Sequence, residues 1–480
     1  MKKRTKIIAT IGPASCSPSM INRMIVGGTD VFRINLSHST IDDAKKILSI
    51  LKDESIKAKR PVASLLDLQG QKIRIGSFSK KKNIHLKSST KFTLNGSLPL
   101  DKGTSKEVGI SYKSLAKHVK VGDELLLSDA LIKLEIVKIS GNKILTNVVR
   151  GGVLKPNQGV NKKGGGLSLR GLTDKDLSNL KQALSLDIDY IAVSFVKDEK
   201  DIMKVRKILK KKNIGIIAKI ERAEALKKID QIAKVSDGIL VARGDLGVEI
   251  GIEQLPAVQD EIIRKSISLD KVVIVATQMM ESMINSRVPT RAEVFDVANA
   301  VTSGADAIML SAETAIGKYP SDVVHEATRI CDIAEKTNTK IIKLDRRAEN
   351  INAVDQIIAL SAVHAAASSQ IKAIACLTET GSTPMWMSRV QSSIPIYAMT
   401  QNDYTSRRIC LYKGVYSIKL NTIEYDHARA NKQVIDLMVE WGAVKKGDFV
   451  IITKGDLMGT SGGTNAMKIV EVGNLVEVER

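Results

Sequence analysis

The chain has 480 residues, which is more than a single hydrophobic core usually organises, so several domains are expected. Hydrophobic residues make up 43% of the chain, as in globular proteins, and no apolar run reaches the roughly 18 residues that would cross a bilayer. The net charge of +21 could indicate nucleic-acid binding, but lysines are spread along the chain and only 3% of the residues are aromatic. We therefore expect no nucleic-acid or membrane partner, and a basic surface that favours anionic substrates.

Cysteine and histidine usage indicates neither a disulfide framework nor a zinc site. The four cysteines, Cys16, Cys331, Cys376 and Cys410, are scattered without a CxxC pair, and the six histidines form no HExxH motif. Such isolated thiols are typical of a reduced, cytoplasmic protein.

Short apolar runs alternate with helix-length amphipathic segments through much of the chain. Alternation of this kind predicts parallel strands joined by right-handed crossovers, and eight strand–helix units predict a closed (β/α)8 TIM barrel of the α/β class. The eight predicted strands are residues 6–11, 31–36, 61–68, 190–195, 215–220, 238–242, 272–276 and 307–310.

The segment between the third and fourth predicted strands breaks this rhythm. Residues 71–166 contain short β-like runs separated by turn signals such as Asn95-Gly96 and Gly141-Asn142, which predict an inserted small β-barrel domain. Such an insertion at the active face of a barrel is a natural lid. Gly164, Gly165 and Gly166 mark its exit, where either a hinge or ordinary turn geometry would explain the glycines.

After a charged stretch at residues 343–350, helices and strands alternate again. This pattern predicts a third, C-terminal α/β domain with an open sheet. We expect barrel segments at 1–70 and 167–342, the lid at 71–166 and the C-terminal domain at 343–480. The predicted strands of that domain are 373–377, 396–399, 449–453 and 468–472.

Polar side chains recur where three of the predicted barrel strands end. Lys219 and Glu221, Asp245, and Thr277 each follow a buried apolar run. Ligands of α/β folds bind at the carboxyl ends of strands, and an ammonium with two carboxylates there suggests a divalent metal that holds an anionic substrate. Taken singly, the carboxylates could cap helices, and Lys219 could pair with Glu221 on the surface.

Eight motifs, taken together and in this order, resemble the pyruvate kinase family over essentially the whole chain. They are KIIATIGP at 6–13, RINLSH at 33–38, AKIE at 218–221, VARGDLGVE at 241–249, ATQMMESM at 276–283, PTRAE at 289–293, DVANA at 296–300 and MLSAET at 309–314. Within them, Thr290 to Glu293 is also a helix capping box, and Met279, Met280 and Met283 are expected to pack as core residues.

The resemblance implies phosphoryl transfer from phosphoenolpyruvate to ADP, giving pyruvate and ATP. In that reaction Glu221 and Asp245 would bind Mg²⁺ or Mn²⁺, and Lys219 would stabilise charge on the transferring phosphoryl group. The backbone N–H groups of Gly244 and Asp245 would hold the substrate carboxylate, and Thr277 would contact the substrate. The residues leave open which group protonates the enolate.

Further residues would bind the nucleotide and the phosphates. Arg33 and Arg74 would clamp phosphates, because a guanidinium offers forked donors. Asn35 and His38 would lie near the nucleotide, although His38 could equally be a loop histidine without a ligand.

Several positions depart from the family pattern. Many members bind K⁺ through residues that match Asn35, Ser37, Asp67 and the backbone oxygen of Leu68, but here Lys72 replaces the glutamate that accompanies the ion. A fixed ammonium could replace the cation, so we expect K⁺ to be dispensable. Three further differences put nucleotide affinity and lid closure in doubt: Gln71 for proline, Asn157-Gln158 for a basic pair, and Ser128-Asp129-Ala130 for Asp-Asp-Gly.

The C-terminal domain carries a candidate effector loop. Hydroxyls and backbone N–H groups at a helix start can bind phosphate, and the matching family loop binds an activating sugar phosphate; a nucleotide effector is also possible by the resemblance. Simple helix capping by Ser382 or Thr383 is the alternative. The loop is Thr378, Glu379, Thr380, Gly381, Ser382 and Thr383, with residues 459–465 closing over it.

Two other functions compete with this interpretation. A phosphoenolpyruvate- or pyruvate-using lyase on the same barrel would lack the insert at 71–166 and the C-terminal phosphate loop. A non-catalytic, basic nucleic-acid-binding protein would show damaged site residues and salt-dependent binding. The resemblance favours a cytoplasmic homotetramer with kinase activity.

Overall fold

Eight parallel strands close into a barrel in the computed structural model of the chain, which describes residues 3–79, 83–167, 171–210, 212–337, 353–421, 426–456 and 462–474. The strands lie in the order β1-β16-β15-β14-β13-β12-β3-β2, so the predicted TIM barrel is confirmed. Their bounds are β1 (Lys6–Thr10), β2 (Val31–Asn35), β3 (Ala63–Asp67), β12 (Tyr190–Val193), β13 (Gly215–Ile220), β14 (Gly238–Ala242), β15 (Val272–Ala276) and β16 (Ala307–Leu310).

The barrel strands are apolar on both faces because both faces are covered. Ile7 and Phe32 belong to the cluster that packs against the surrounding helices, whereas Ile8, Leu65 and Ile217 belong to a second cluster, separate from it. The surrounding helices are α1 (Pro18–Gly27), α2 (Ile41–Lys57), α3 (Asp174–Ala183), α4 (Glu199–Leu209), α6 (Ile229–Val235), α8 (Leu255–Ser268), α9 (Arg291–Ser303) and α11 (Pro320–Thr337).

Short helices follow several strands at their carboxyl ends. They are α5 (Ala223–Leu226), α7 (Arg243–Ile250), η2 (Ile252–Gln254), η3 (Glu281–Ile284) and α10 (Ala312–Ala315). Two local predictions hold in this region. Thr290 and Glu293 form a reciprocal capping box at the start of α9, and Met279, Met280 and Met283 are fully buried in the barrel core.

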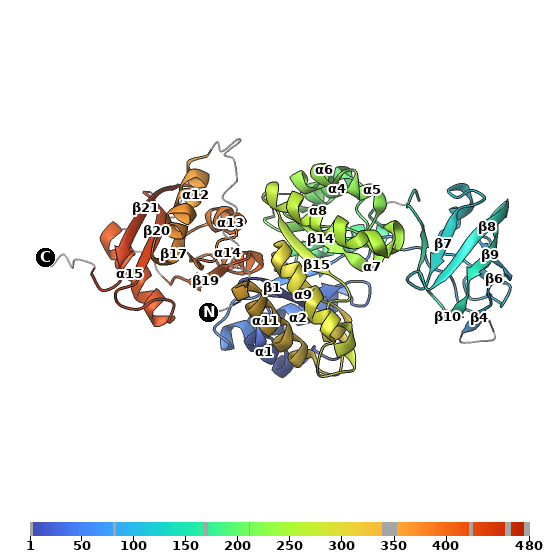
Figure 1. Cartoon of the computed structure of the whole chain (residues 1–480), viewed down its shortest axis with the longest axis horizontal. Helices are drawn as coiled ribbons and strands as arrows, with labels where there is room; N and C mark the ends of the chain where they lie inside the picture. Colours follow the sequence, from blue (N-terminus) through green and yellow to red (C-terminus); the bar gives the residue numbers. More distant parts are fainter. Residues whose placement is uncertain are drawn as a thin grey trace.

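The insert is an all-β body that lies at one side of the barrel (Figure 1). Its main sheet has six strands in the order β11-β7-β8-β9-β5-β6, and β10 pairs with β4 in a separate ladder. Residues 73–76 bridge the two edge strands of this main sheet through the antiparallel bridges Arg74–Gly159 and Ile75–Ile110, so the sheet is connected round, as the predicted small barrel requires. The elements are β4 (Ile84–Leu86), β5 (Lys91–Asn95), β6 (Glu107–Gly109), η1 (Leu115–Lys117), β7 (Glu124–Leu127), β8 (Ile132–Ser140), β9 (Lys143–Arg150), β10 (Gly152–Leu154) and β11 (Val160–Lys162).

The C-terminal body is an open five-stranded sheet with helices, on the far side of the barrel from the insert (Figure 1). The strand order β19-β18-β17-β20-β21 includes β19, which the sequence did not reveal, and β21 pairs antiparallel with β20. The charged stretch at 343–350 lies outside the described residues. The elements are α12 (Val354–Ala367), β17 (Ile371–Leu377), α13 (Ser382–Arg389), β18 (Ile396–Thr400), α14 (Asp403–Arg408), η4 (Ile409–Leu411), β19 (Val415–Lys419), α15 (His427–Glu440), β20 (Phe449–Gly455) and β21 (Thr464–Glu471).

The C-terminal body attaches to the amino ends of the barrel strands through buried polar contacts. Arg389, the last residue of α13, forms an ion pair with Asp306, which directly precedes β16, and both side chains are 1% exposed. Lys413 Nζ donates to the carbonyl oxygens of Val301 and Ala305 at 3.2 and 3.0 Å. A buried charge pair is costly unless both partners are satisfied, so these contacts fix one docking geometry.

The described helices offer no candidate membrane span: none of them is both long and apolar enough to cross a bilayer. All four cysteines are free, and three of them are buried, with Cys16 exposed. Burial raises the pKa of the Cys331, Cys376 and Cys410 thiols to about 12, so these thiols are protonated at neutral pH.

Candidate active site

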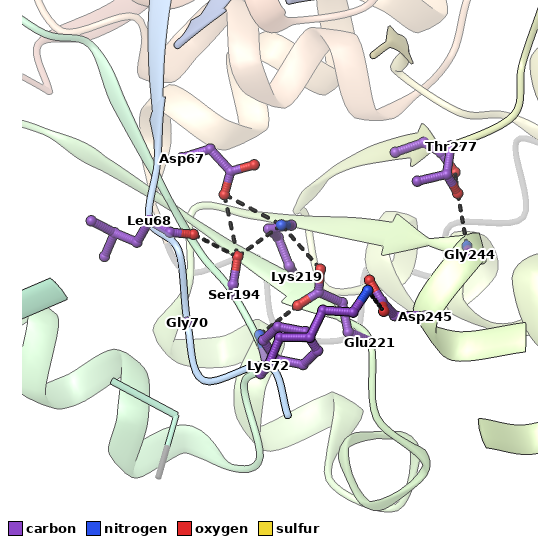
Figure 2. A network of polar contacts seen from close by, with 12 residues as sticks. Asp67, Leu68, Gly70, Lys72, Ser194, Lys219, Glu221, Gly244, Asp245 and Thr277 are labelled. Carbon is purple, nitrogen blue, oxygen red and sulfur yellow. Dashed lines mark hydrogen bonds and ion pairs between the residues drawn. The ribbon is translucent and has the colours of Figure 1, made fainter. Parts of the chain in front are cut away.

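Asp67, Ser194 and Glu221 surround the Lys219 ammonium, whereas Thr277 lies apart, beside Gly244 (Figure 2). Lys219 lies on β13, and its Nζ is 2.8 Å from Ser194 Oγ, 3.0 Å from Glu221 Oε1 and 3.3 Å from Asp67 Oδ1. Burial would lower the pKa of the ammonium, but the carboxylates of Asp67 and Glu221 outweigh burial and raise the pKa above its ordinary value. Lys219 is therefore a buried, permanently charged cation, and not one half of a surface ion pair.

Asp67 connects this cation to a second one. Its carboxylate receives Arg33 Nε at 2.7 Å and Arg33 Nη2 at 2.6 Å, and Arg33 Nη1 also donates to Thr10 Oγ1 at 3.0 Å. Burial alone would raise the pKa of Asp67, but Lys219 and Arg33 lower it below its ordinary value. Two positive side chains are thus fixed at the mouth of the barrel, as a polyanionic substrate requires.

Glu221 faces Asp245 across the same site (Figure 2). Its Oε2 accepts the Phe195 N–H at 2.5 Å. Burial raises the pKa of Glu221 above its ordinary value, and the negative charge of Asp245 adds to the rise while Lys219 opposes it. Asp245 Oδ1 in turn receives Lys72 Nζ at 2.6 Å. Both candidate metal ligands are therefore paired with a lysine.

The donor set formed by Glu221 and Asp245 suits a hard divalent cation. No cluster of three or more histidine, cysteine or acidic side chains with metal-binding geometry occurs in the described part of the chain. Mg²⁺ needs no such cage, because it commonly takes one or two carboxylates and keeps water and substrate oxygens as its other ligands. The residues present fit that ion, although Lys72 occupies one oxygen of Asp245.

Thr277 adopts a strained backbone at the end of β15. Its φ of 72° lies in the left-handed region, which a β-branched residue rarely adopts. Thr277 Oγ1 accepts the Gly244 N–H at 2.8 Å and donates to the Ala276 carbonyl at 2.5 Å. Helix α7 does begin here, as predicted, but the Gly244 N–H is not free for a substrate carboxylate: Thr277 already takes it.

Arg243 supports this strained segment, and the sequence analysis missed it. Its Nη2 donates to the Thr277 carbonyl at 2.6 Å, and its Nη1 forms an ion pair with Asp296 at 2.6 Å. Ser194 was also missed: its Oγ accepts from Lys219 and donates to the Leu68 carbonyl at 2.7 Å. Ser194 directly follows a buried strand, so the strand-end rule that found Lys219 and Thr277 would have found it as well.

The proposed nucleotide residues come from the insert and from the loop after β2. Arg74 lies on the insert, where its Nη1 donates to the Asn157 carbonyl at 2.9 Å. His38 is exposed in the loop after β2, and Asn35 Oδ1 accepts the Ser37 N–H at 3.0 Å.

The four positions proposed for K⁺ lie together. Asn35 pairs with Asp67 in the β2–β3 ladder, Ser37 bonds to Asn35, and Leu68 follows Asp67. Asp67 already binds two cationic side chains, however, and the Leu68 carbonyl accepts from Ser194. Lys72 binds Asp245 and not Asp67, which places its charge on the divalent-metal side of the site.

The candidate effector loop begins α13 without a side-chain cap, so capping by Ser382 or Thr383 does not occur. Gly381 is the N-cap, in the left-handed conformation, and its N–H donates to Thr378 Oγ1 at 2.9 Å. The Thr380 and Ser382 hydroxyls are 2.9 Å apart, and the Glu379 carbonyl accepts from Thr405 at 2.6 Å. Thr383 contacts Thr464 of the second loop, of which residues 459–461 lie outside the described residues.

Most of the chain is similar to proteins of one family. Residues 2–324 match the family described as pyruvate kinase, barrel domain, and residues 356–470 match pyruvate kinase, alpha/beta domain. The chain is 45% identical to the pyruvate kinase of Buchnera aphidicola subsp. Baizongia pistaciae over 98% of this chain and 99% of that protein. It is 41% identical to pyruvate kinase II of Salmonella typhimurium, again over 98% and 99%.

A more distant relative agrees. Pyruvate kinase of Geobacillus stearothermophilus is 38% identical over 99% of this chain and 81% of that protein. Matches to both family domains, in order, and full-length identity well above 30% accompany a barrel whose strand ends carry the family's motif residues. The chain belongs to the pyruvate kinase family.

Proposed function

We propose that the chain transfers the phosphoryl group of phosphoenolpyruvate to ADP, giving pyruvate and ATP, the last step of glycolysis. The observation that carries this proposal is the buried Lys219 ammonium, held by Asp67, Ser194 and Glu221 beside a second carboxylate, Asp245. Phosphoryl transfer needs positioning and charge neutralisation more than covalent chemistry, and this group of side chains supplies both.

Each residue has a part in the mechanism. Arg33 and Lys219 bind the phosphoryl oxygens, and the fixed ammonium stabilises the charge that spreads over them during transfer. Glu221 and Asp245 hold the divalent cation, Mg²⁺ or Mn²⁺, which when bound neutralises substrate oxygens. Thr277 and the N terminus of α7, at Gly244 and Asp245, orient the substrate carboxylate once the Thr277 hydroxyl releases the Gly244 N–H.

The insert and the C-terminal body support further proposals. Arg74, Asn35 and His38 bind the nucleotide when the insert closes, and residues 378–383 bind a phosphorylated effector. The domain limits that we propose are 1–70 with 167–342 for the barrel, 71–166 for the insert and 343–480 for the C-terminal domain.

A lyase would need neither the insert nor the C-terminal domain. Intact Lys219, Glu221, Asp245 and Thr277 weigh against a binding protein without catalysis.

Assembly and location are proposed on the same basis. Apolar side chains gather on the surface near α9, where Phe295 is 77% exposed and Val288 66% exposed, and edge strand β21 exposes Ile469. Such surfaces suit contacts between copies of the chain, so we propose a homotetramer. The free thiols support a cytoplasmic location.

The reaction is tested by measuring pyruvate formed from phosphoenolpyruvate and ADP with purified protein and Mg²⁺. We expect turnover that requires both substrates and the divalent cation. A phosphorylated sugar is added if basal turnover is absent, because the effector loop could hold the enzyme in a low-activity state. Failure under both conditions would contradict the proposed reaction.

Omitting K⁺ from the same assay tests the role of Lys72. We expect turnover to change less than about tenfold when an inert organic cation replaces K⁺, because Arg33 and Lys219 already place fixed positive charges on Asp67 of the candidate K⁺ site and Lys72 adds another, 2.6 Å from Asp245. Lys72→Glu should create a K⁺ requirement. A more than tenfold loss in the unsubstituted protein without K⁺ would overturn this expectation.

A further inference from the structure

Three consecutive glycines with left-handed backbones return the insert to the barrel. Gly164, Gly165 and Gly166 have φ values of 79°, 71° and 85°. L-residues are disfavoured in this conformation, although residues 128–130 also adopt it, so three glycines in a row lower the backbone strain of this segment. The contacts of these glycines with the barrel indicate what the segment does.

Two acidic residues of the barrel hold these glycines. The Gly164 N–H donates to the Glu249 carbonyl at 2.8 Å, and the Gly166 N–H donates to Glu224 Oε1 at 2.7 Å. A Cβ on Gly165 would lie 2.8 Å from Glu224 Oε2 and 3.2 Å from Glu249 Oε2. The middle glycine thus lies directly against both carboxyl groups, and a side chain there would displace at least the Glu224 carboxyl group.

The same two acids lie on the segments that carry the candidate metal ligands. Glu249 is in α7, one turn after Asp245, and Glu224 is in α5, three residues after Glu221. Glu249 Oε2 accepts the Ala223 N–H at 2.8 Å and so joins α7 to the start of α5. Movement of the hinge is thereby connected to both segments.

We propose that Glu224 and Glu249 are positioning residues that clamp the Gly164–Gly166 hinge to the segments holding Glu221 and Asp245, so that the position of the insert and the geometry of the metal site change together. The coupling between the insert and the metal site rests on the metal-ligand roles that we proposed above for Glu221 and Asp245. The clamp rests only on the contacts of Gly164–Gly166 with Glu224 and Glu249.

The charges around the clamp give it a pH dependence. Burial raises the pKa of Glu249 to about 7, the Ala223 N–H opposes the rise, and the charge of Glu224 adds to it. Glu224 Oε2 is buried and accepts no hydrogen bond within the described residues, although Arg222 Nε lies 3.9 Å away. The other charges that face the pair are Asp245 and Lys162, and Lys162 is itself paired with Asp123.

The sign follows from the direction of the shift. The pKa of Glu249 in the folded protein lies above its ordinary value of 4.5, so the folded state favours the protonated acid. The protonated Glu249 side chain therefore stabilises the clamp fully below pH 4.5, and this stabilisation is lost as the pH rises through about 7. Two carboxylates then repel each other across Gly165.

Hydrogen exchange of the hinge amides tests the clamp without any substrate. We expect Glu224→Ala to lower the protection factors of residues 162–167 about tenfold, because the Gly166 N–H loses its side-chain acceptor. It should also weaken Mn²⁺ binding, measured by titration, about tenfold, as outer-sphere substitutions at metal sites do. Glu224→Gln keeps an acceptor for the Gly166 N–H and should restore both properties. Glu253→Ala, an exposed acid in the next element, is the matched control.

The pH profile separates the clamp from a merely structural role. Protection of the hinge in the unsubstituted protein should fall as the pH rises through about 7, whereas Glu249→Gln should abolish that dependence. Unchanged hinge exchange in Glu224→Ala would overturn the clamp. If that variant does not fold, Gly165→Ala, which places a methyl between the two carboxyl groups, must loosen the hinge for the proposal to stand. Faster exchange of the hinge amides with unaltered Mn²⁺ affinity would refute the coupling between the hinge and the metal site but not the clamp. This conclusion would hold whatever the turnover assay shows.

Discussion

Lys219→Met is expected to lower kcat about 10³-fold. The ammonium is the buried cation that contacts both Asp67 and Glu221, and a fixed charge that stabilises a transition state contributes on the order of 3–4 kcal/mol. Methionine is an unbranched side chain of similar shape, one atom shorter, that removes the charge and the hydrogen bond to Ser194. The measurement is steady-state pyruvate formation at saturating phosphoenolpyruvate, ADP and Mg²⁺.

The matched control for this change is Lys200→Met, which removes an exposed lysine from α4. Removing Lys219 also leaves Glu221 buried without its cation, so the thermal unfolding midpoint of both variants must be measured alongside turnover. Turnover within tenfold of the unsubstituted protein, in a folded Lys219→Met variant, would remove Lys219 from the mechanism.

Asp245→Asn should weaken Mn²⁺ binding by at least about tenfold and reduce kcat/KM about 10³-fold, since only one carboxylate ligand, Glu221, remains. The amide also releases Lys72 from its ion pair, which adds an unpaired positive charge to the site. Binding is measured by titration with Mn²⁺ in the absence of substrates, and turnover is measured as above.

Asp230→Asn serves as the control, because that carboxylate is 54% exposed and its nearest cation, Lys265, is 3.8 Å away. Raising the Mg²⁺ concentration should recover part of the lost kcat/KM in Asp245→Asn. Full activity with unchanged Mn²⁺ affinity would show that Asp245 binds no metal and that Lys72 is its functional partner.

The barrel was predictable because buried strands carry a strong local signal. Runs such as residues 272–276 are apolar throughout, and their spacing leaves room for the intervening helices. The position of Lys219, Glu221, Asp245 and Thr277 at one end of the barrel then follows from topology alone. Strand β19 was not predicted, because this strand, residues 415–419, is short and mixes apolar with polar side chains.

The directions of individual groups at the site could not be predicted, because spacing does not encode them. The Gly244 N–H was expected to be free, but the left-handed backbone of Thr277 aims its hydroxyl at that group. Arg74 was expected to clamp phosphates, as Arg33 was, and its place is set by the insert, where it donates to the Asn157 carbonyl. Both cases turn on a few backbone dihedral angles, which one sequence leaves undetermined.

The parallel barrel keeps attachment and chemistry at opposite ends of the same strands. The ion pair of Arg389 with Asp306 lies where β16 begins, whereas Lys219 and Thr277 lie where β13 and β15 end. In evolutionary terms, the two ends can diverge separately. The ligand specificity of the C-terminal sheet can change in a lineage, or its response to effectors can be lost. The residues that bind the phosphoryl group meanwhile remain under the same purifying selection.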